Sequence, residues 1–550
     1  MMVQKKRIAP VVLAAASLKV SFGFVHGNPN GALSVGVPSF KIRDDHFCDL
    51  RPCRRFLHSH VTEQGGDIQS TFPPRSLRLK SSLIGNRTFK LDIVTRRLCW
   101  ISLIASVIAV FPTPVTKLLP LVLLPLAAVL HITKRFCGGP KTGVGSALPA
   151  SKHLKCIYLD YNATTPIFPE VAEAMKPYVF GSCFGNPSSS HVYGKGCKEA
   201  LEKARKRVAA LIGAQTSEII FESCGSEADF HAIESCVSVG KQKLIEDGIA
   251  ERPHVISSTI EHPAVSKCLN RLRDRGEIDV TYVGVDNYGV VNLKGVEEAL
   301  KPNTVLVTVM HANNEVGTIQ PILDISLLCQ KHGRALLHTD AAQSVGKIPV
   351  NVGTLGIDLM TLAAHKYGGP KGVAALYVRK GTPFEPMLLG GPQESGRRAG
   401  TENVPLIVGL GQASCIAEAE LGETMDHMKK LRNQLQQYLI NELPPGSVRV
   451  HGPKSDNLRL PNTLSIGFKG ISVGCLKPAL DPKVACSAGA ACHGSGKSIS
   501  AVLQAMNVPE EYGFGTLRIS LGRHTTEADI MRAGKAIKEE VLKLQKAGGQ

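Results

Sequence analysis

The fold is decided by residues 304–343, which read TVLVTVMHANNEVGTIQPILDISLLCQKHGRALLHTDAAQ. The run Thr304–Met310 is apolar and rich in β-branched residues, which is typical of a buried strand. The amphipathic segment Ile322–His332 predicts a helix, and the apolar run Ala335–His338 predicts a second strand. Strand, helix and strand in this order form the repeating unit of a parallel sheet covered by helices. We therefore predict an α/β fold with a mainly parallel sheet.

The same alternation extends outward over most of residues 156–550. Short apolar runs predict further strands at Ile219–Phe221, His254–Ser258, Leu359–Leu362 and Ala374–Val378, and amphipathic segments predict helices at Ala200–Leu211 and Ala264–Arg273. From about residue 416 a long helical segment and then strands predict a smaller α+β domain. We expect a large domain over 156–415, whose first residues pack with the small domain, and a small domain over 416–550.

Polar side chains follow five of the predicted strands, at the point where each strand ends. In open α/β sheets, ligands bind at the carboxyl ends of the strands, so we expect these side chains to meet in one site. The five clusters are Gly225-Ser226-Glu227, Glu261-His262, Asn313-Asn314-Glu315, Asp340-Ala341-Ala342-Gln343 and His365-Lys366.

Lys366 and Asp340 together indicate a cofactor site. Lys366 lies among small residues in the stretch Ala363–Gly372, where desolvation would lower its pKa and let its amine attack an aldehyde. Alone it could equally be a solvated lysine in a glycine-rich turn, and Asp340 alone could be a helix N-cap. Pyridoxal 5′-phosphate (PLP) needs an acid facing its ring nitrogen, and Asp340 at a strand end is suited to that task. The pair favours a PLP enzyme.

Six motifs in the order found here resemble those of the cysteine desulfurase and selenocysteine lyase group of class V, fold-type I PLP-dependent enzymes. The six are LDYNATTP at 159–166, FGNPSS at 184–189, EH at 261–262, HANNE at 311–315, HTDAAQ at 338–343 and HK at 365–366. Together with the C-terminal motifs described below, they extend over nearly all of residues 156–535. The resemblance implies the fold-type I architecture, a large domain with a mainly parallel seven-stranded sheet and a smaller α+β domain.

The resemblance also implies a role for each matching residue. Lys366 would hold PLP as a Schiff base, Asp340 would pair with the ring nitrogen, and His262 would stack on the ring. The remaining cofactor contacts would come from Gln343 and Asn313 at the ring oxygen O3′ and from Ser226 and His365 at the phosphate.

Three further matches concern the substrate and a second subunit. Arg518, in LRISLGR at 517–523, would bind the substrate α-carboxylate in a bidentate manner, and Asn186 would also lie at the substrate. Thr401, in RAGT at 398–401, would reach the cofactor phosphate of a neighbouring subunit. A homodimer is therefore implied.

The sulfur-handling residue is expected to be Cys492, in the loop SAGAACHGSG at 487–496. Small, flexible residues around one thiol would let the loop carry it to the substrate sulfur and away again. Cys486 is the competing thiol, but its place before the Gly/Ala run fits the family position less well. His493 beside Cys492 could tune the thiolate.

Two positions depart from the desulfurase pattern. Ala363 stands where many desulfurases have a phosphate-binding serine, and Phe230 stands where an amide residue is usual. The string GAACH at 489–493 and the non-serine at 363 also resemble the selenocysteine lyase branch. The preferred chalcogen, sulfur or selenium, stays open.

The expected reaction is removal of sulfur, or selenium, from L-cysteine, or L-selenocysteine, giving L-alanine and an enzyme persulfide or selenide. The sulfur would pass to an acceptor or scaffold protein for iron-sulfur cluster or other cofactor assembly. The alternatives are a lyase specific for selenocysteine, another class V aminotransferase, and a non-catalytic membrane scaffold built on a decayed desulfurase.

The basic charge of the chain belongs to its N-terminal part. Residues 1–150 hold 20 Lys and Arg against 6 Asp and Glu, which is +14 of the net +18. The catalytic part is close to neutral, so a nucleic-acid partner is not expected. The 15 cysteines include no C-x-x-C pair and no cluster at zinc-finger spacing, so no metal site is predicted.

The N-terminal extension is predicted to bring the chain to a membrane. Residues 1–97 are typical of a targeting or disordered basic segment, although Asp44, Asp45 and Asp49 argue against a transit peptide. Residues 98–116 carry no charge and are long enough to cross a hydrocarbon core of about 30 Å. We predict membrane association through residues 98–133 of a hydrophobic segment, 98–135, either as one tilted span or as a re-entrant hairpin, followed by a linker at 136–155. The expected compartment is an organelle, plastid or mitochondrion, with a soluble cytosolic catalytic domain as the alternative.

Overall fold

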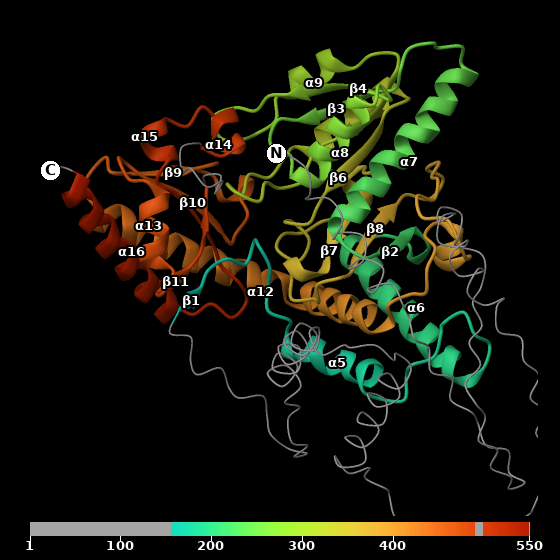
Figure 1. Ribbon diagram of the computed structural model, residues 1–550, viewed down its shortest axis with the longest axis horizontal. Coiled ribbons are helices and arrows are strands. Elements are labelled where there is room, and N and C mark those ends of the chain that lie inside the picture. Colours follow the sequence, from blue (N-terminus) through green and yellow to red (C-terminus); the bar gives the residue numbers. More distant parts are fainter. Residues whose placement is uncertain (1–155, 490–498, 549–550) are drawn as a thin grey trace, which may run out of the picture. The chain divides into compact units, whose positions relative to one another are not determined.

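The computed structural model describes residues 156–489 and 499–548 (Figure 1). The predicted extension at 1–97, the hydrophobic segment at 98–135, the linker at 136–155 and Cys492 lie outside the described residues. The described chain contains a large sheet with helices on both faces and a smaller antiparallel sheet.

The large sheet has seven strands in the order β2-β8-β7-β6-β5-β3-β4. Only β8 runs antiparallel to its neighbours, so the prediction of a mainly parallel seven-stranded sheet is confirmed. The strands are β2 (Ile219–Glu222), β3 (His254–Ser258), β4 (Asp279–Val283), β5 (Thr304–Thr308), β6 (Leu336–Asp340), β7 (Leu359–Ala363) and β8 (Ala374–Val378).

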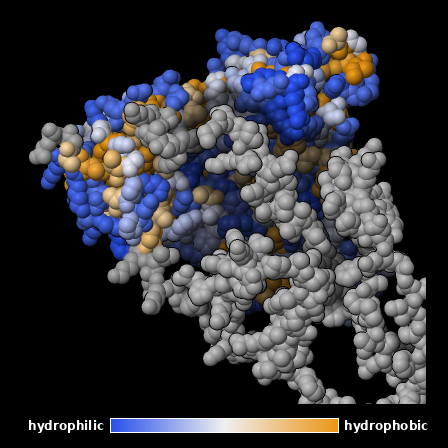
Figure 2. Space-filling model, in the orientation of Figure 1, coloured by the Kyte–Doolittle hydropathy of each residue, from blue (hydrophilic) through white to orange (hydrophobic). Residues whose placement is uncertain are grey.

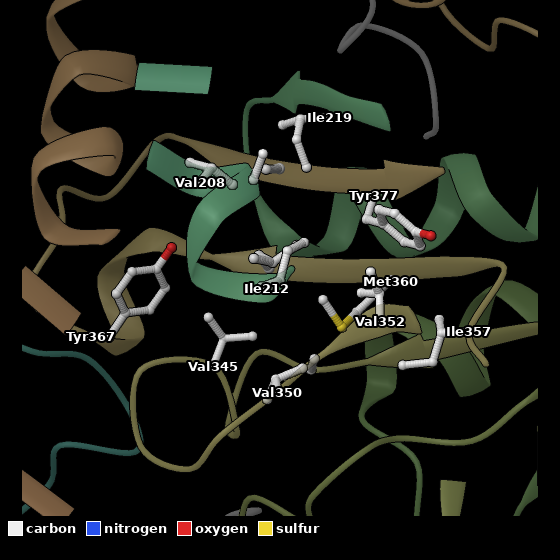
Figure 3. Close-up of a cluster of buried hydrophobic side chains, with 14 of the residues drawn as sticks. Val208, Ile212, Ile219, Val345, Val350, Val352, Ile357, Met360, Tyr367 and Tyr377 are labelled. Carbon is white, nitrogen blue, oxygen red and sulfur yellow. The ribbon is translucent and has the colours of Figure 1, made fainter. Parts of the chain in front are cut away.

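Helices cover both faces of this sheet because its strands are apolar on both sides. In β2, Ile219 and Phe221 point into one core and Ile220 into the other. The first core includes residues of α6, α10, α11 and α12, and part of it is shown in Figure 3. The second includes residues of α7 and α8. The large-domain helices are α5 (Pro169–Val179), α6 (Val192–Ile212), α7 (Gly225–Glu246), α8 (Pro263–Asp274), α9 (Leu293–Ala299), α10 (Ile322–His332) and α11 (Val352–Leu355), with 3-10 turns η3 (Thr216–Glu218), η4 (Ala364–Lys366) and η5 (Gln393–Gly396).

The C-terminal part forms a four-stranded antiparallel sheet in the order β12-β13-β10-β9. The first described strand, β1, pairs with β11, and Ile157 and Leu159 are buried in the core of this part. Its elements are β1 (Ile157–Tyr158), β9 (Val448–His451), η6 (Asp456–Leu458), β10 (Thr463–Phe468), α13 (Val473–Leu480), β11 (Val484–Ala485), β12 (Ser487–Ala488), α14 (Ala501–Ala505), α15 (Glu510–Gly513), β13 (Thr516–Ser520) and α16 (Glu527–Gly548).

A single long helix, α12 (Val404–Glu442), joins the two parts. Its residues up to Ala417 belong to the large-domain core, and those from Leu431 belong to the small-domain core. The boundary placed at 415 and 416 therefore falls inside a continuous helix. Among the described residues, α12 is the one helix long and apolar enough to cross a membrane, but much of it is buried within the protein. On the face seen in Figure 2, hydrophilic residues predominate around α9 and apolar ones form separate patches.

Candidate active site

A pocket lies where the parallel strands of the large sheet end. It gathers six of the residues that the sequence predicts for a cofactor: Ser226, His262, Asp340, Gln343, His365 and Lys366. They come from the start of α7, the start of α8, the end of β6 and the turn after β7. The ends of the parallel strands therefore bring together residues up to 140 positions apart in the chain, as expected for a ligand site in an open α/β sheet.

Lys366 ends the 3-10 turn η4 and points back to the loop after β1. Its Nζ donates hydrogen bonds to the carbonyl oxygens of Asn162, at 2.7 Å, and Ala163, at 3.0 Å. Burial and the nearby Arg518 lower the pKa of Lys366 to about 8. A larger share of the amine is therefore unprotonated at neutral pH than in an ordinary lysine, as attack on an aldehyde requires.

Asp340 is the last residue of β6, and its Oδ1 accepts the N–H of Ala342 at 2.9 Å. Burial raises the pKa of its carboxyl group. The hydrogen bond from Ala342 and the nearby His262 and Lys366 partly offset this by lowering the pKa. A buried carboxyl group beside His262 and Lys366 is suited to pair with a ring nitrogen that carries a proton.

His262 is the N-cap of α8, where its Nδ1 accepts the N–H of Ala264 at 3.2 Å. Burial lowers the pKa of His262. This contact fixes the orientation of the ring at the pocket, and the lowered pKa favours the neutral imidazole, which can stack on a planar ligand.

Ser226 and His365, the residues predicted to bind the phosphate, both line the pocket. Ser226 is in the first turn of the long helix α7, whose free N–H groups attract anions. The Nδ1 of His365 lies 3.2 Å from Thr164 Oγ1, and burial lowers the pKa of His365 to about 4. The imidazole is neutral at pH 7 and can bind a phosphate only as a hydrogen-bond donor.

Gln343 is buried beside Lys366, and its amide is already partly used within the protein. Its Nε2 donates to the Asn162 carbonyl at 3.0 Å, and its Oε1 accepts from Lys347 Nζ at 2.7 Å. Because an amide nitrogen has two N–H groups, one is left for a ligand.

The prediction that Asn313 contacts the cofactor needs a correction. Its side chain is fully buried, with Nδ2 donating to the Ile260 carbonyl and Oδ1 accepting from the N–H groups of Glu315 and Val316. It stabilises its own turn and does not line the pocket. The neighbouring Asn314 lines the pocket instead. Nothing in the order Asn-Asn distinguishes the two residues before the turn is folded.

Thr401 and Asn186 lie away from this pocket in the single chain. Thr401 lines a separate cavity with Glu222 and Arg398. Asn186 is exposed between α5 and α6, where its Oδ1 accepts the N–H of Ser188. The predicted reach of Thr401 is to the cofactor of a second subunit.

Arg518 lies on β13 and contacts the loop after β1. Its guanidinium donates to Asp160 Oδ1 at 3.0 Å, to Ser487 Oγ at 2.9 Å and to the Asn314 carbonyl at 3.3 Å. Its Nε is buried without a hydrogen-bond partner among the described residues. The side chain is held by Asp160, a partner that the sequence did not indicate, close to the loop that lines the pocket.

Cys486 is a poor candidate for the reactive thiol. It is buried in the small-domain core, and burial raises its pKa to about 12. A thiol of this kind is inert at neutral pH. Cys492 stays a prediction, but Gly489 and Ser500, which flank its segment, are hydrogen-bonded to each other, and Gly489 also bonds to Thr516 of β13.

The structure adds one carboxyl group that the sequence reading missed. Asp229 lines the pocket, and its Oδ1 is buried without a hydrogen-bond partner among the described residues. Burial and the nearby Asp340 raise its pKa well above the ordinary value. Asp229 follows Ser226 by three residues on α7, and this helical spacing could have placed it on the same face.

The two departures from the desulfurase pattern have different surroundings. Ala363 lines the pocket, so a phosphate-binding hydroxyl is absent at that point. Phe230 packs against the second core, with the Arg271 guanidinium 5.5 Å from the centre of its ring. Its aromatic ring is explained by packing.

The side chains of the pocket fit PLP. An amine with a lowered pKa suits the aldehyde, a buried carboxyl group suits the ring nitrogen, and the start of α7 suits the phosphate. Lys366, Asp340 and Ser226 would hold these three parts of the cofactor.

Comparison with known proteins agrees with this site. The family model of class V aminotransferases matches residues 157–532. The chain is 43% identical over 393 residues to a cysteine desulfurase of Trichormus azollae, which covers 71% of this chain and 94% of that protein. It is 42% identical over 377 residues to the cysteine desulfurase IscS of Dictyoglomus turgidum, and the match covers 68% of this chain and 91% of that protein.

Two solved structures are similar. A NifS-like protein superposes with a TM-score of 0.64 at 37% identity, covering 71% of this chain and all of the other. SspA in complex with cysteine superposes with a TM-score of 0.56 at 35% identity, and the match covers 67% of this chain and 99% of SspA. The chain therefore belongs to the class V aminotransferase family of PLP-dependent enzymes, within its cysteine desulfurase group.

Proposed function

We propose that this protein removes sulfur from L-cysteine in a PLP-dependent reaction, giving L-alanine and a persulfide on Cys492. The observation that carries the proposal is the pocket in which Lys366, Asp340 and His262 meet at the strand ends. The family relationship and the SspA structure in complex with cysteine support the choice of substrate.

PLP, when bound, withdraws electrons from the substrate α-carbon. Lys366 would hold it and, once displaced by the substrate amine, would take the α-proton at its Nζ, for which a pKa of about 8 is suitable. Asp340 would hold the ring nitrogen in its protonated form. Arg518 would orient the substrate by its α-carboxylate.

Cys492 would act on the substrate sulfur. Its thiolate would form a sulfur–sulfur bond while the bond between the substrate sulfur and its β-carbon breaks. The electron pair of that bond stays with the substrate, which takes up one proton at the β-carbon, regains one at the α-carbon from Lys366 Nζ, and leaves as L-alanine. The sulfur remains on Cys492 as a persulfide.

The test uses Cys492→Ala and Lys366→Ala in the full chain. Cys492→Ala should keep the absorbance of bound PLP but lose sulfide and persulfide formation from L-cysteine, because only the nucleophile is removed. Lys366→Ala should lose the absorbance of lysine-bound cofactor. Full sulfide formation by Cys492→Ala would refute the role of that thiol, and an unchanged spectrum in Lys366→Ala would refute the cofactor site.

A selenocysteine-specific lyase is the second candidate. The string GAACH at 489–493 and Ala363 in the pocket favour it. Measuring L-alanine released from L-cysteine and from L-selenocysteine side by side distinguishes the two: comparable yields support the desulfurase, and alanine from selenocysteine alone supports the lyase.

The protein is also proposed to act as a homodimer, with Thr401 contacting the partner's cofactor. Five apolar side chains near the facing ends of α5 and α6 are between half and fully exposed, which is unusual for large apolar residues and typical of an interface. They are Val179, Phe180, Phe184, Val192 and Tyr193, here called the α5–α6 patch.

Sulfur transfer to an acceptor protein and attachment to an organellar membrane through residues 98–133 complete the proposal. The uncharged run at 98–116 supports the attachment. Fractionation of the expressed full chain without detergent tests it: recovery with membranes is expected, and a fully soluble chain would refute it.

A further inference from the structure

Asn162 lies at the junction of the large and small domains, with its polar groups hydrogen-bonded on both sides. Its N–H donates to Ser520 Oγ at 2.9 Å, and its Nδ2 donates to Thr463 Oγ1 at 2.9 Å and to the Asn314 carbonyl at 3.2 Å. Its Oδ1 accepts from Asn462 Nδ2 at 2.9 Å. Only 1% of the residue is exposed. A buried polar residue satisfied this completely holds one geometry.

The other side of Asn162 faces the groups proposed for catalysis. Its carbonyl oxygen accepts from Lys366 Nζ at 2.7 Å and from Gln343 Nε2 at 3.0 Å. Lys347 Nζ donates to Asn162 Oδ1 at 3.1 Å and to Gln343 Oε1 at 2.7 Å. Lys347, Gln343 and Asn162 therefore form a closed ring of hydrogen bonds against the amine of Lys366.

Lys347 is a second buried lysine that the proposed reaction leaves unused. It is 4% exposed, and no ion pair within residues 156–489 and 499–548 includes it. Burial, with Lys366 and Arg518 nearby, lowers its pKa well below the ordinary value. A buried amine whose hydrogen bonds run to two oxygen acceptors orients those partners.

Arg518 is tied to the same network. The Asn314 carbonyl that accepts from Asn162 Nδ2 also accepts from the Arg518 guanidinium at 3.3 Å. Arg518, which would bind the substrate carboxylate, and Lys366, which would take the α-proton, are thus linked through Asn162.

We propose that Asn162 and Lys347 are positioning residues that set the places of Lys366 and Gln343 relative to Arg518. The inference rests on the proposed function, because the placement matters for catalysis only if these groups bind cofactor and substrate.

The first variant is Lys347→Met in the full chain, which keeps the length and apolar bulk of the side chain but removes the donor. The dissociation constant for PLP should rise about tenfold, equivalent to about 1.4 kcal/mol. The pH midpoint of the bound-cofactor absorbance should move by about half a unit or more. Ser344→Ala is the matched control, since Ser344 is buried on the same turn and, within the described part of the chain, its hydroxyl bonds only to the Ala341 carbonyl.

The second variant is Asn162→Asp, which has the same shape. It replaces the donor to Asn314 and Thr463 with an oxygen and places a negative charge beside both lysines, which favours their charged forms. The absorbance midpoint should move to higher pH, and KM for L-cysteine should rise by a larger factor than kcat falls. This variant tests the inference even if Lys347→Met does not fold.

A purely structural network would give a different result. Folded variants with unchanged PLP affinity and absorbance midpoint, and only a lower melting temperature, would overturn the inference. Because both measurements need no turnover, an unaltered chain that yields no alanine from L-cysteine, while the variants still show the shifts, would overturn the proposed function alone.

Discussion

Lys366 shows how one side chain acquires its chemistry from its surroundings. Burial and Arg518 lower its pKa to about 8, while Asp340 and Asp160 act in the opposite direction. A lysine with a lowered pKa is unprotonated above that pH and protonated below it. The rate at which the cofactor-free chain captures PLP should therefore rise about tenfold per pH unit below 8 and level off above it, whereas an ordinary lysine would level off near 10.4. The absorbance change on mixing measures this rate.

Asp160→Asn should lower the pH at which the rate of PLP capture levels off. The substitution removes a carboxylate that stabilises the charged amine of Lys366, and it leaves the positive charge of Arg518 less neutralised. Asp286→Asn, at an exposed turn, is the control and should leave that pH unchanged. A capture rate that levels off only near pH 10.4 in the unaltered chain would mean that Lys366 is solvated.

At the scale of elements, the loop that carries Thr401 is anchored by a buried ion pair. Glu394, in η5, accepts two hydrogen bonds from Arg205 of α6, at 2.6 and 2.8 Å, and one from the Phe221 N–H at 2.9 Å. Glu394 and Ser395 adopt positive φ angles of 49° and 59°, which non-glycine residues avoid, so these contacts hold an unfavourable backbone. Glu394→Gln should lower the free energy of unfolding by about 3–5 kcal/mol, because it leaves the buried Arg205 with only the half-exposed Glu202, 3.4 Å from its Nε, as a charge partner.

Urea denaturation measures this loss. Glu173→Gln is the matched control, since Glu173 pairs with Lys176 on an exposed face of α5 and the change should be small. Equal effects of the two substitutions would show that the buried pair does not anchor the loop.

At the scale of the whole molecule, the α5–α6 patch is expected to lie between two copies of the chain. Phe180 is 86% exposed and Phe184 is 72% exposed, which is costly for aromatic side chains in water. Phe180→Asp should convert the dimer to a monomer in sedimentation experiments and weaken PLP binding, because Thr401 of a partner would no longer be present. Leu323→Asp, on α10, changes an exposed apolar residue outside the patch and should leave the dimer intact. A dimeric Phe180→Asp would refute the interface.

The sequence alone predicted the parallel sheet, the strand ends that build the site and the family. These follow from local signals: apolar runs of strand length, amphipathic helices between them, and polar residues directly after each run. Lys366, Asp340, His262 and Ser226 could be found because each stands at a strand end or a helix start. Asn313 could not be told from Asn314, because the turn decides which of the two side chains is used internally.

Only the tertiary structure decided how these groups are held. Asp160 is separated from Arg518 by 358 residues, and Asn162 from Lys347 by 185, yet each pair is in hydrogen-bond contact. Charges and donors at such separations leave no local pattern, because burial and the close approach of the two domains create the interaction. The same burial lowers the pKa values of Lys366 and Lys347. The sequence thus determined which chemical groups the protein has, and the folded chain determined their protonation and their positions.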